Sequence, residues 1–158
     1  TGQSSLTVAA NWSDIELTRF NPDFVDDDRR LEIERGRPDS RFTATLRHAQ
    51  DAWRLMGRLR YYGEHYDDPT DSGGLQANAY FAEPRTVFDL EAGYDFSDSG
   101  SVVLGLQNAF DEYPQVNSNP NSLNDYGHVE VAGLAYPESS PLGFNGGYYY
   151  LRLTWQMQ

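Results

Sequence analysis

Six segments of the chain alternate apolar and polar residues with a period of two. That period is typical of β-strands, in which successive side chains point to opposite faces. Each segment has close to the roughly 10 residues that a tilted strand needs to cross a lipid bilayer. The predicted strands run from about Ser4 to Ser13, Arg41 to Ala49, Ala52 to Tyr62, Thr86 to Phe96, Ser101 to Phe110 and Tyr148 to Gln158.

Charged residues occupy one face of the third and fourth predicted strands. Because these strands are expected to be antiparallel neighbours, arginines on the third should lie beside carboxylates on the fourth. In a membrane barrel this polar face would line the lumen, whereas in a soluble domain it would be a solvated surface. The residues are Arg54, Arg58 and Arg60 on the third strand, and Asp89, Glu91 and Asp95 on the fourth.

The connections between the predicted strands alternate between short and long. Long connections without secondary structure are uncommon in compact soluble domains, whereas membrane barrels combine short periplasmic turns with long extracellular loops. The pattern therefore predicts an all-β fold of antiparallel up-and-down strands, with three long loops on one side. The short connections are Gln50–Asp51 and Ser97–Gly100, and the long ones are about Asp14–Ser40, Gly63–Arg85 and Asp111–Gly147.

Composition excludes two classes of protein. A net charge of −12 argues against nucleic-acid binding, because contacts with phosphates need a basic surface. No stretch approaches the roughly 18 consecutive apolar residues of a membrane helix, so a helical membrane protein is excluded. Many of the 11 Tyr, 8 Phe and 3 Trp lie near strand ends, as in the aromatic girdles of membrane barrels, although aromatic residues favour strands in any β protein.

The sequence offers little support for a catalytic or metal site. It has no Cys, no Gly-x-Ser-x-Gly elbow and no phosphate-binding loop, and its carboxylate pairs lie mostly in loops. We therefore expect neither an enzyme nor a bound cofactor. The nearest approach to a metal site is in the second long loop, where a solvated acidic loop is the default interpretation and the spacing does not match an EF-hand. Its potential ligands are Glu64, His65, Asp67, Asp68 and Asp71.

The first long loop contains two further patterns. Asp26–Arg30 is a run of charges expected to be solvated, with binding of a divalent cation or a cationic ligand as the alternative. Arg30–Glu34 alternates, which predicts that the first two strands extend beyond the membrane as a hairpin.

The last seventy residues carry an ordered set of motifs. The run Asn108–Pro114 ends the fifth strand, a long polar loop follows, and a segment rich in Pro and Gly leads into the sixth strand. This order resembles the carboxyl-terminal end of a TonB-dependent outer-membrane receptor, although Gly147 stands where that family commonly has Arg. The residues that carry the resemblance are Asn108, Phe110, Asp111, Glu112, Pro114, Pro137, Pro141, Gly143 and Gly146.

The sixth predicted strand is similar to the barrel-closing strand of that family. The resemblance implies that the barrel assembly machinery recognises its alternating apolar residues. The terminal Phe usual in the family is absent, and Met157-Gln158 stands in its place. The alternating residues are Tyr149, Leu151, Leu153, Trp155 and Met157.

The resemblance implies that residues 1–158 form the last six strands and three extracellular loops of a large transmembrane β-barrel in the outer membrane of a Gram-negative bacterium. The plug domain and the preceding strands would lie outside this chain. The implied function is uptake of a scarce nutrient, most often a ferric siderophore, energised by the TonB complex, with haem, vitamin and oligosaccharide ligands left open. The alternatives are a stand-alone small β-barrel or sandwich that acts as a binding or adhesion module, and a secreted carbohydrate-active domain with buried paired carboxylates.

Overall fold

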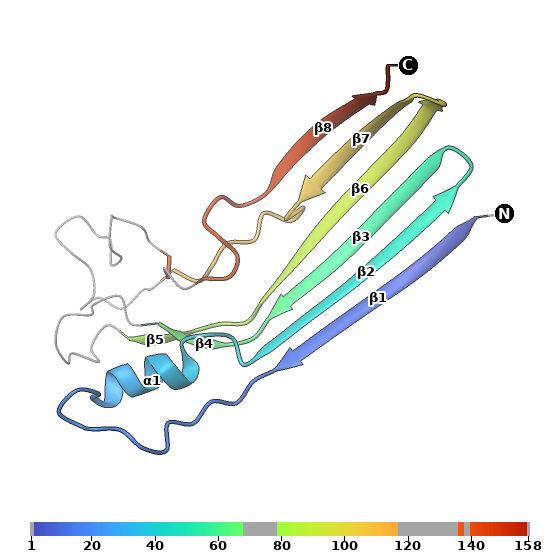
Figure 1. Cartoon of the computed structure of the whole chain (residues 1–158). Helices are drawn as coiled ribbons and strands as arrows, with labels where there is room; N and C mark the ends of the chain where they lie inside the picture. The colour runs from blue at the N-terminus through green and yellow to red at the C-terminus, as the bar shows by residue number, and fades with distance from the viewer. Residues whose placement is uncertain (1, 68–78, 117–135, 138–139, 158) are drawn as a thin grey trace, which may run out of the picture.

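One layer of six antiparallel strands forms the body of the molecule (Figure 1). The computed structural model describes residues 2–67, 79–116, 136–137 and 140–157. Within this sheet each strand pairs with the strands that precede and follow it, which confirms the predicted all-β, up-and-down arrangement. The sheet is open, with its first and last strands as edges. In order across the sheet, the strands are β1 (Gln3–Trp12), β2 (Ser40–Gln50), β3 (Trp53–Tyr62), β6 (Arg85–Ser97), β7 (Gly100–Gln107) and β8 (Tyr148–Trp155).

The two ends of the sheet differ in the connections that they carry. The short turns β2–β3 and β6–β7 lie at one end, together with both termini of the chain (Figure 1). The only helix and a small hairpin of the described residues lie beyond the opposite end, with the longer connections. Asp51 adopts a left-handed backbone conformation with a φ of 52°, as the tight turn between β2 and β3 requires.

The first long connection contains a helix, α1 (Asp27–Arg35), so the predicted hairpin at Arg30–Glu34 is wrong. The Asp26 side chain caps the helix by accepting a 2.8 Å hydrogen bond from the Arg29 backbone N–H. Arg30 and Glu34, one helical turn apart, form an ion pair at 2.9 Å. The five-residue alternation predicted a strand, but a capping residue and an ion pair at helical spacing stabilise a helix here instead.

The second long connection contains a two-stranded sheet that the sequence pattern did not reveal. Strand β4 (His65–Asp67) pairs with β5 (Tyr80–Ala82) in antiparallel register. Strand β4 packs against α1, and the Tyr66 ring lies edge-on to Phe81 with 5.5 Å between ring centroids. These elements form a cap at the end of the large sheet opposite its short turns.

No second layer covers the large sheet within the described residues (Figure 1). Soluble domains normally bury a sheet against another sheet or a layer of helices. The buried apolar side chains here are few and scattered, and they do not form one continuous core. They are Pro38, Tyr66, Ala82, Val87, Val103, Pro114 and Pro137.

The fifth predicted strand ends earlier than expected. Strand β7 stops at Gln107, because Asn108 turns the chain with a φ of 50°. Strand β8 likewise stops at Trp155.

Candidate functional site

The two faces of the large sheet differ in chemistry. The strand registers place Leu6, Leu46, Gly57, Leu90, Leu106 and Tyr149 in one row across it. We call the face that carries this row the apolar face. The adjacent row points the other way and consists of Ser5, Arg47, Met56, Glu91, Gly105 and Tyr150. We call the face that carries this second row the polar face.

Burial is reversed relative to a soluble domain. On β6, Asp89 of the polar face is 5% exposed, whereas its neighbour Leu90 on the apolar face is 47% exposed. On β2, Thr45 is 6% exposed and Leu46 is 53% exposed. Long arginine and tyrosine side chains cover the polar face, while nothing in the described chain covers the leucines. Such a contiguous apolar surface marks contact with a membrane or another protein.

The apolar face carries no Asp, Glu or Arg in any of the six strands, although the chain contains 24 acidic and 12 basic residues. Aromatic side chains flank it near the short turns. The Trp53 and Tyr94 rings lie 4.7 Å apart between centroids, and those of Phe96 and Trp155 lie 5.7 Å apart. The face therefore has an uncharged centre and an aromatic margin.

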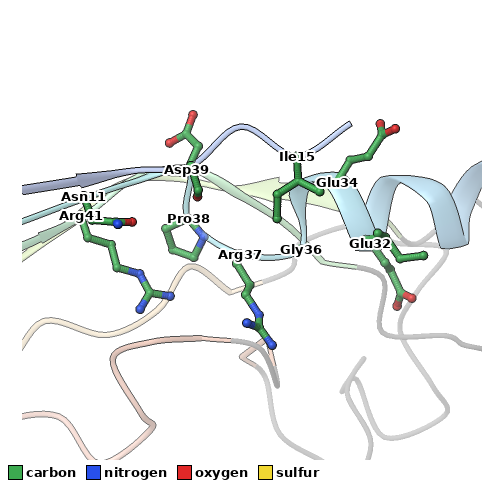
Figure 2. A pocket seen from close by; sticks show the side chains of 11 residues that line it. Asn11, Ile15, Glu32, Glu34, Gly36, Arg37, Pro38, Asp39 and Arg41 are labelled. Carbon is green, nitrogen blue, oxygen red and sulfur yellow. The ribbon is translucent and has the colours of Figure 1, made fainter. Parts of the chain in front are cut away.

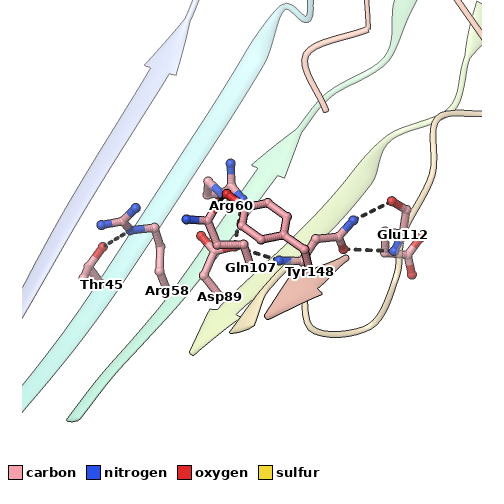
Figure 3. Close-up of polar contacts among 8 residues, drawn as sticks. Thr45, Arg58, Arg60, Asp89, Gln107, Glu112 and Tyr148 are labelled. Carbon is pink, nitrogen blue, oxygen red and sulfur yellow. Dashed lines mark hydrogen bonds and ion pairs between the residues drawn. The ribbon is translucent and has the colours of Figure 1, made fainter. Parts of the chain in front are cut away.

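The polar face brings together all six charged residues singled out from the sequence. Arg60 forms a 2.8 Å ion pair with Asp89, and Arg54 pairs with Asp95. Arg58 instead donates a 3.3 Å hydrogen bond to Thr45 (Figure 3). Glu91 accepts from Tyr150 and lies 3.6 Å from Arg152, two partners on β8 that the sequence pattern did not suggest.

A compact turn follows β7 and contains the signature residues Asn108–Pro114. Asn108 Nδ2 donates a 2.7 Å hydrogen bond to the Glu112 carbonyl, and its Oδ1 accepts a 2.9 Å bond from the Glu112 N–H. The Asn108 backbone N–H donates to the Asp89 carboxylate at 3.0 Å. Phe110 packs edge-on against Phe88, and Pro114 is buried. The turn is thus attached to the ion pairs of the polar face.

Asp111 connects this turn to the start of β8. Its Oδ1 accepts a 2.8 Å hydrogen bond from the Gly147 N–H. The same carboxylate lies beside Tyr113 and raises the pKa of the tyrosine hydroxyl. Gly146 has a φ of 62°, and a Cβ there would lie 2.2 Å from the Tyr113 hydroxyl oxygen. This explains why a glycine, rather than a residue with a side chain, occupies position 146.

The remaining residues of the Pro- and Gly-rich segment lead the chain into β8. Pro137 is fully buried, and Pro141 is half-buried. Gly143 has a φ of 72°, in the left-handed region that favours glycine. Tyr136 stacks between Tyr113 and Phe144, with 5.7 and 6.3 Å between ring centroids.

Strand β8 pairs on one side only, with β7. Its alternating apolar residues lie on the apolar face and are strongly exposed, while Met157 follows the end of the strand. Its other edge is unpaired within the described residues. These exposed residues are Tyr149, Leu151, Leu153 and Trp155.

The potential metal ligands of the second loop do not form a cluster. Within residues 2–67, 79–116, 136–137 and 140–157, no group of three or more His, Asp or Glu side chains is placed to hold a metal ion. Glu64 pairs with Arg35 at 3.7 Å, and His65 and Asp67 are buried in β4. Asp68 and Asp71 lie outside the described residues.

A cavity of about 480 Å³ lies between α1 and the adjoining ends of β1 and β2 (Figure 2). Glu34, one of its lining residues, is held by Arg30, and that hydrogen bond lowers the pKa of the Glu34 carboxyl. Arg37 and Arg41 extend to the same side of the chain, away from Asp39 (Figure 2). The cavity is therefore lined by groups of both signs, with the carboxylates of Glu32, Glu34 and Asp39 beside the two guanidinium groups.

Comparison of the chain with protein-family models, with curated proteins and with solved structures gave no match. None of the described helices is long and apolar enough to span a membrane.

Proposed function

We propose that the chain forms one wall of a transmembrane β-barrel in the bacterial outer membrane, and that this barrel belongs to an active transporter of the TonB-dependent type. The observation that carries the proposal is the apolar face, whose exposed residues cross six adjacent strands without a formal charge. A charge at the bilayer midplane costs about 2 to 4 kcal/mol in such proteins, so their lipid-facing surface is free of charge. Surfaces in contact with water have no such constraint.

The lengths of the elements also support a membrane location. Strands β1, β2 and β3 have 10, 11 and 10 residues, close to the roughly 10 that a tilted strand needs to span a bilayer, whereas β6 has 13 and β7 and β8 have 8 each. The aromatic residues Trp53, Tyr94, Phe96 and Trp155 lie near the short turns, where a girdle at the lipid interface is expected. The short turns would then face the periplasm, and α1 and the β4–β5 hairpin would face the exterior.

The open sheet supports a larger assembly. Within the described part of the chain, the outer edges of β1 and β8 have no partner strand, and backbone N–H and C=O groups cannot remain unpaired in a bilayer. Six strands are also fewer than the roughly 8 of the smallest membrane barrels. The partners implied are therefore lipid, further barrel strands, a plug domain in the lumen, the barrel assembly machinery that recognises β8, and the TonB complex.

The transported ligand is a scarce nutrient, for which a ferric siderophore is the leading candidate. This part of the proposal depends on the resemblance of Asn108–Pro114 and of the Pro- and Gly-rich segment to the receptor family. Asn108 and Asp111 join β6, β7 and β8 at the end that carries the long loops, and this supports the assignment of the motif to a barrel wall.

The test is fractionation of native cells followed by an immunoblot with an antiserum raised against residues 1–158. We expect a band much larger than 17.9 kDa in the outer membrane, with a mobility that changes on boiling, as folded membrane barrels show. A water-soluble band of 17.9 kDa would reject the transporter and favour the stand-alone binding or adhesion module.

A further inference from the structure

The polar face carries an excess of positive charge, although the chain as a whole has a net charge of −12. The strand registers place seven arginines and three carboxylates on this face, an excess of four positive charges. The carboxylates are Asp89, Glu91 and Asp95. The arginines are Arg41, Arg47, Arg54, Arg58, Arg60, Arg85 and Arg152.

The three carboxylates already have arginine partners. Asp89 pairs with Arg60, Asp95 with Arg54 and Glu91 with Arg152. By contrast, Arg47 forms no hydrogen bond or ion pair with any residue in the described part of the chain, and Arg58 bonds only to the uncharged Thr45. Two guanidinium groups at the centre of the face therefore lack a negative partner.

The guanidinium groups of Arg47 and Arg58, together with that of Arg54, surround one point on the sheet. Arg47 of β2 is in register with Met56 of β3, so Arg54 and Arg58 are its diagonal neighbours on either side. Diagonal neighbours on one face lie about 7 to 8 Å apart, within reach of side chains as long as arginine. Like charges this close repel one another, and a bound anion would remove that cost.

A cavity of about 500 Å³ lies at this point, lined by all three arginines. Ser5 and Gln3 of β1 add uncharged hydrogen-bonding groups to the lining. Glu91 is the single carboxylate in the lining, and it is already held by Tyr150 and Arg152. The cavity therefore presents net positive charge.

We propose that this cavity binds an anion with two or more carboxylate or phosphate groups, held by Arg47, Arg54 and Arg58. A planar guanidinium group forms paired hydrogen bonds with a carboxylate or a phosphate. Arg47 and Arg58 have no acidic partner among the described residues and Arg54 shares its charge with Asp95, so the cavity favours an anion with several such groups over a singly charged one. The inference rests on the proposed function and deepens it, because it assigns a negative charge to the solute that the barrel takes up.

Two further arginines lie toward the end of the sheet that carries the long connections. Arg37 and Arg41 point to the same side at the cavity beside α1 (Figure 2). Neither forms an ion pair with a described residue. The same cavity is also lined by Glu32, Glu34 and Asp39, so the excess of positive charge is confined to the polar face around Arg47.

The test is isothermal titration calorimetry on the full-length protein, purified in detergent from the cell fraction that contains it. The probes are tricarballylate and inorganic pyrophosphate, with maltotriose as the uncharged control. We expect the two anions to bind, maltotriose not to bind, and affinity to fall with added NaCl. Arg47→Gln should weaken anion binding about tenfold or more, because it removes a charged fork without breaking an internal bond. Arg58→Gln, which loses only the bond to Thr45, should behave in the same way.

The matched control is Arg29→Gln, which removes an arginine from the exposed surface of α1 and should leave affinity unchanged. Equal anion affinity in Arg47→Gln, Arg58→Gln and the unchanged protein would overturn the site, as would absence of anion binding at millimolar concentration. Fractionation of the cells from which the protein is purified, with binding then measured on whichever fraction contains it, keeps the two proposals apart. An outer-membrane protein that binds neither anion contradicts the anion site alone, whereas a soluble protein with arginine-dependent binding supports the site and rejects the transporter.

Discussion

The ring of Tyr150 lies over Gly105 on the neighbouring strand, and its hydroxyl donates a 2.5 Å hydrogen bond to Glu91 one strand further on. The three residues occupy one row of the polar face, in the order Glu91, Gly105 and Tyr150. Only a residue without a side chain at position 105 leaves room for the ring to cross. This contact joins β6 and β8 directly, although β7 lies between them.

Gly105→Ala should therefore destabilise the sheet. A Cβ at position 105 would lie 2.2 Å from the Tyr150 ring, so the ring must move and its bond to Glu91 is lost. We expect a loss of about 1 to 3 kcal/mol in the free energy of unfolding, measured by urea titration of the full-length protein in lipid vesicles.

Gly57→Ala is the matched control for this prediction. Gly57 lies on the apolar face, and a Cβ there would meet only Leu90 Cδ2, at 3.9 Å. It should change stability much less than Gly105→Ala. If both variants lose the same free energy, the cost comes from placing alanine in a strand rather than from the Tyr150 ring.

Asp89 should be the most costly carboxylate to remove from the polar face. It is buried and accepts hydrogen bonds from Arg60 and from the Asn108 N–H. Asp89→Ala leaves both donors without an acceptor, and we expect a loss of about 3 kcal/mol in unfolding free energy. Asp95→Ala removes an exposed partner of Arg54 and should cost less than about 1 kcal/mol. Equal losses in the two variants would contradict the importance of burial at Asp89.

Much of the large sheet could be predicted from the sequence, because all six of its strands alternate apolar and polar residues. Alternation located all six strands, and the shared face of Arg54 and Asp95 followed from that alternation once the strands were taken as neighbours. The end of β7 was missed because a left-handed Asn108 interrupts a pattern that continues to Phe110. The alternation of apolar and polar residues does not show where the backbone turns left-handed, although Asn is enriched in the left-handed conformation.

The cap elements and the finer contacts depend on signals of other kinds. Helix α1 could have been found from Asp26 as an N-cap and from Arg30 and Glu34 at helical spacing. Strands β4 and β5 have only three residues each and are separated by residues 68–79, so alternation within each strand is too short to predict their pairing. Tyr150 reaches Glu91 only because Gly105 is in register with both, and register across three strands is a property of the folded sheet.

Acid should loosen the cap around His65. This imidazole is buried, and neither ring nitrogen has a hydrogen-bond partner among the residues that the structure describes. Burial, aided by the nearby charge of Arg41 and opposed by Glu64 and the Gly63 carbonyl, lowers the pKa of His65 below its ordinary value of 6.5. The unfolded cap therefore binds the proton more tightly than the folded one. The stability contributed by neutral His65 is present above pH 6.5 and is lost as the pH falls below that value.

Amide hydrogen exchange in β4, followed from pH 7.5 to 5.5, checks this expectation. The unchanged protein should lose protection in β4 as the pH falls, relative to a His65→Gln variant measured under the same conditions. His48→Gln alters an imidazole that bonds Ser4 on β1, and it should leave the pH response of β4 intact. Parallel exchange profiles in the unchanged protein and His65→Gln would show that His65 does not control the cap.

An arginine on the apolar face distinguishes a lipid-facing surface from a solvated one. Leu104 is 52% exposed at the middle of β7, so in water Leu104→Arg should change stability by no more than about 0.5 kcal/mol. At the midplane of a bilayer the same change should cost about 2 to 4 kcal/mol. Thr7→Arg, on the polar face of β1, provides the control because its side chain does not meet lipid in either case. We expect Leu104→Arg, but not Thr7→Arg, to reduce the amount of heat-modifiable protein in the outer membrane. Normal amounts of both variants would show that the apolar face does not contact lipid.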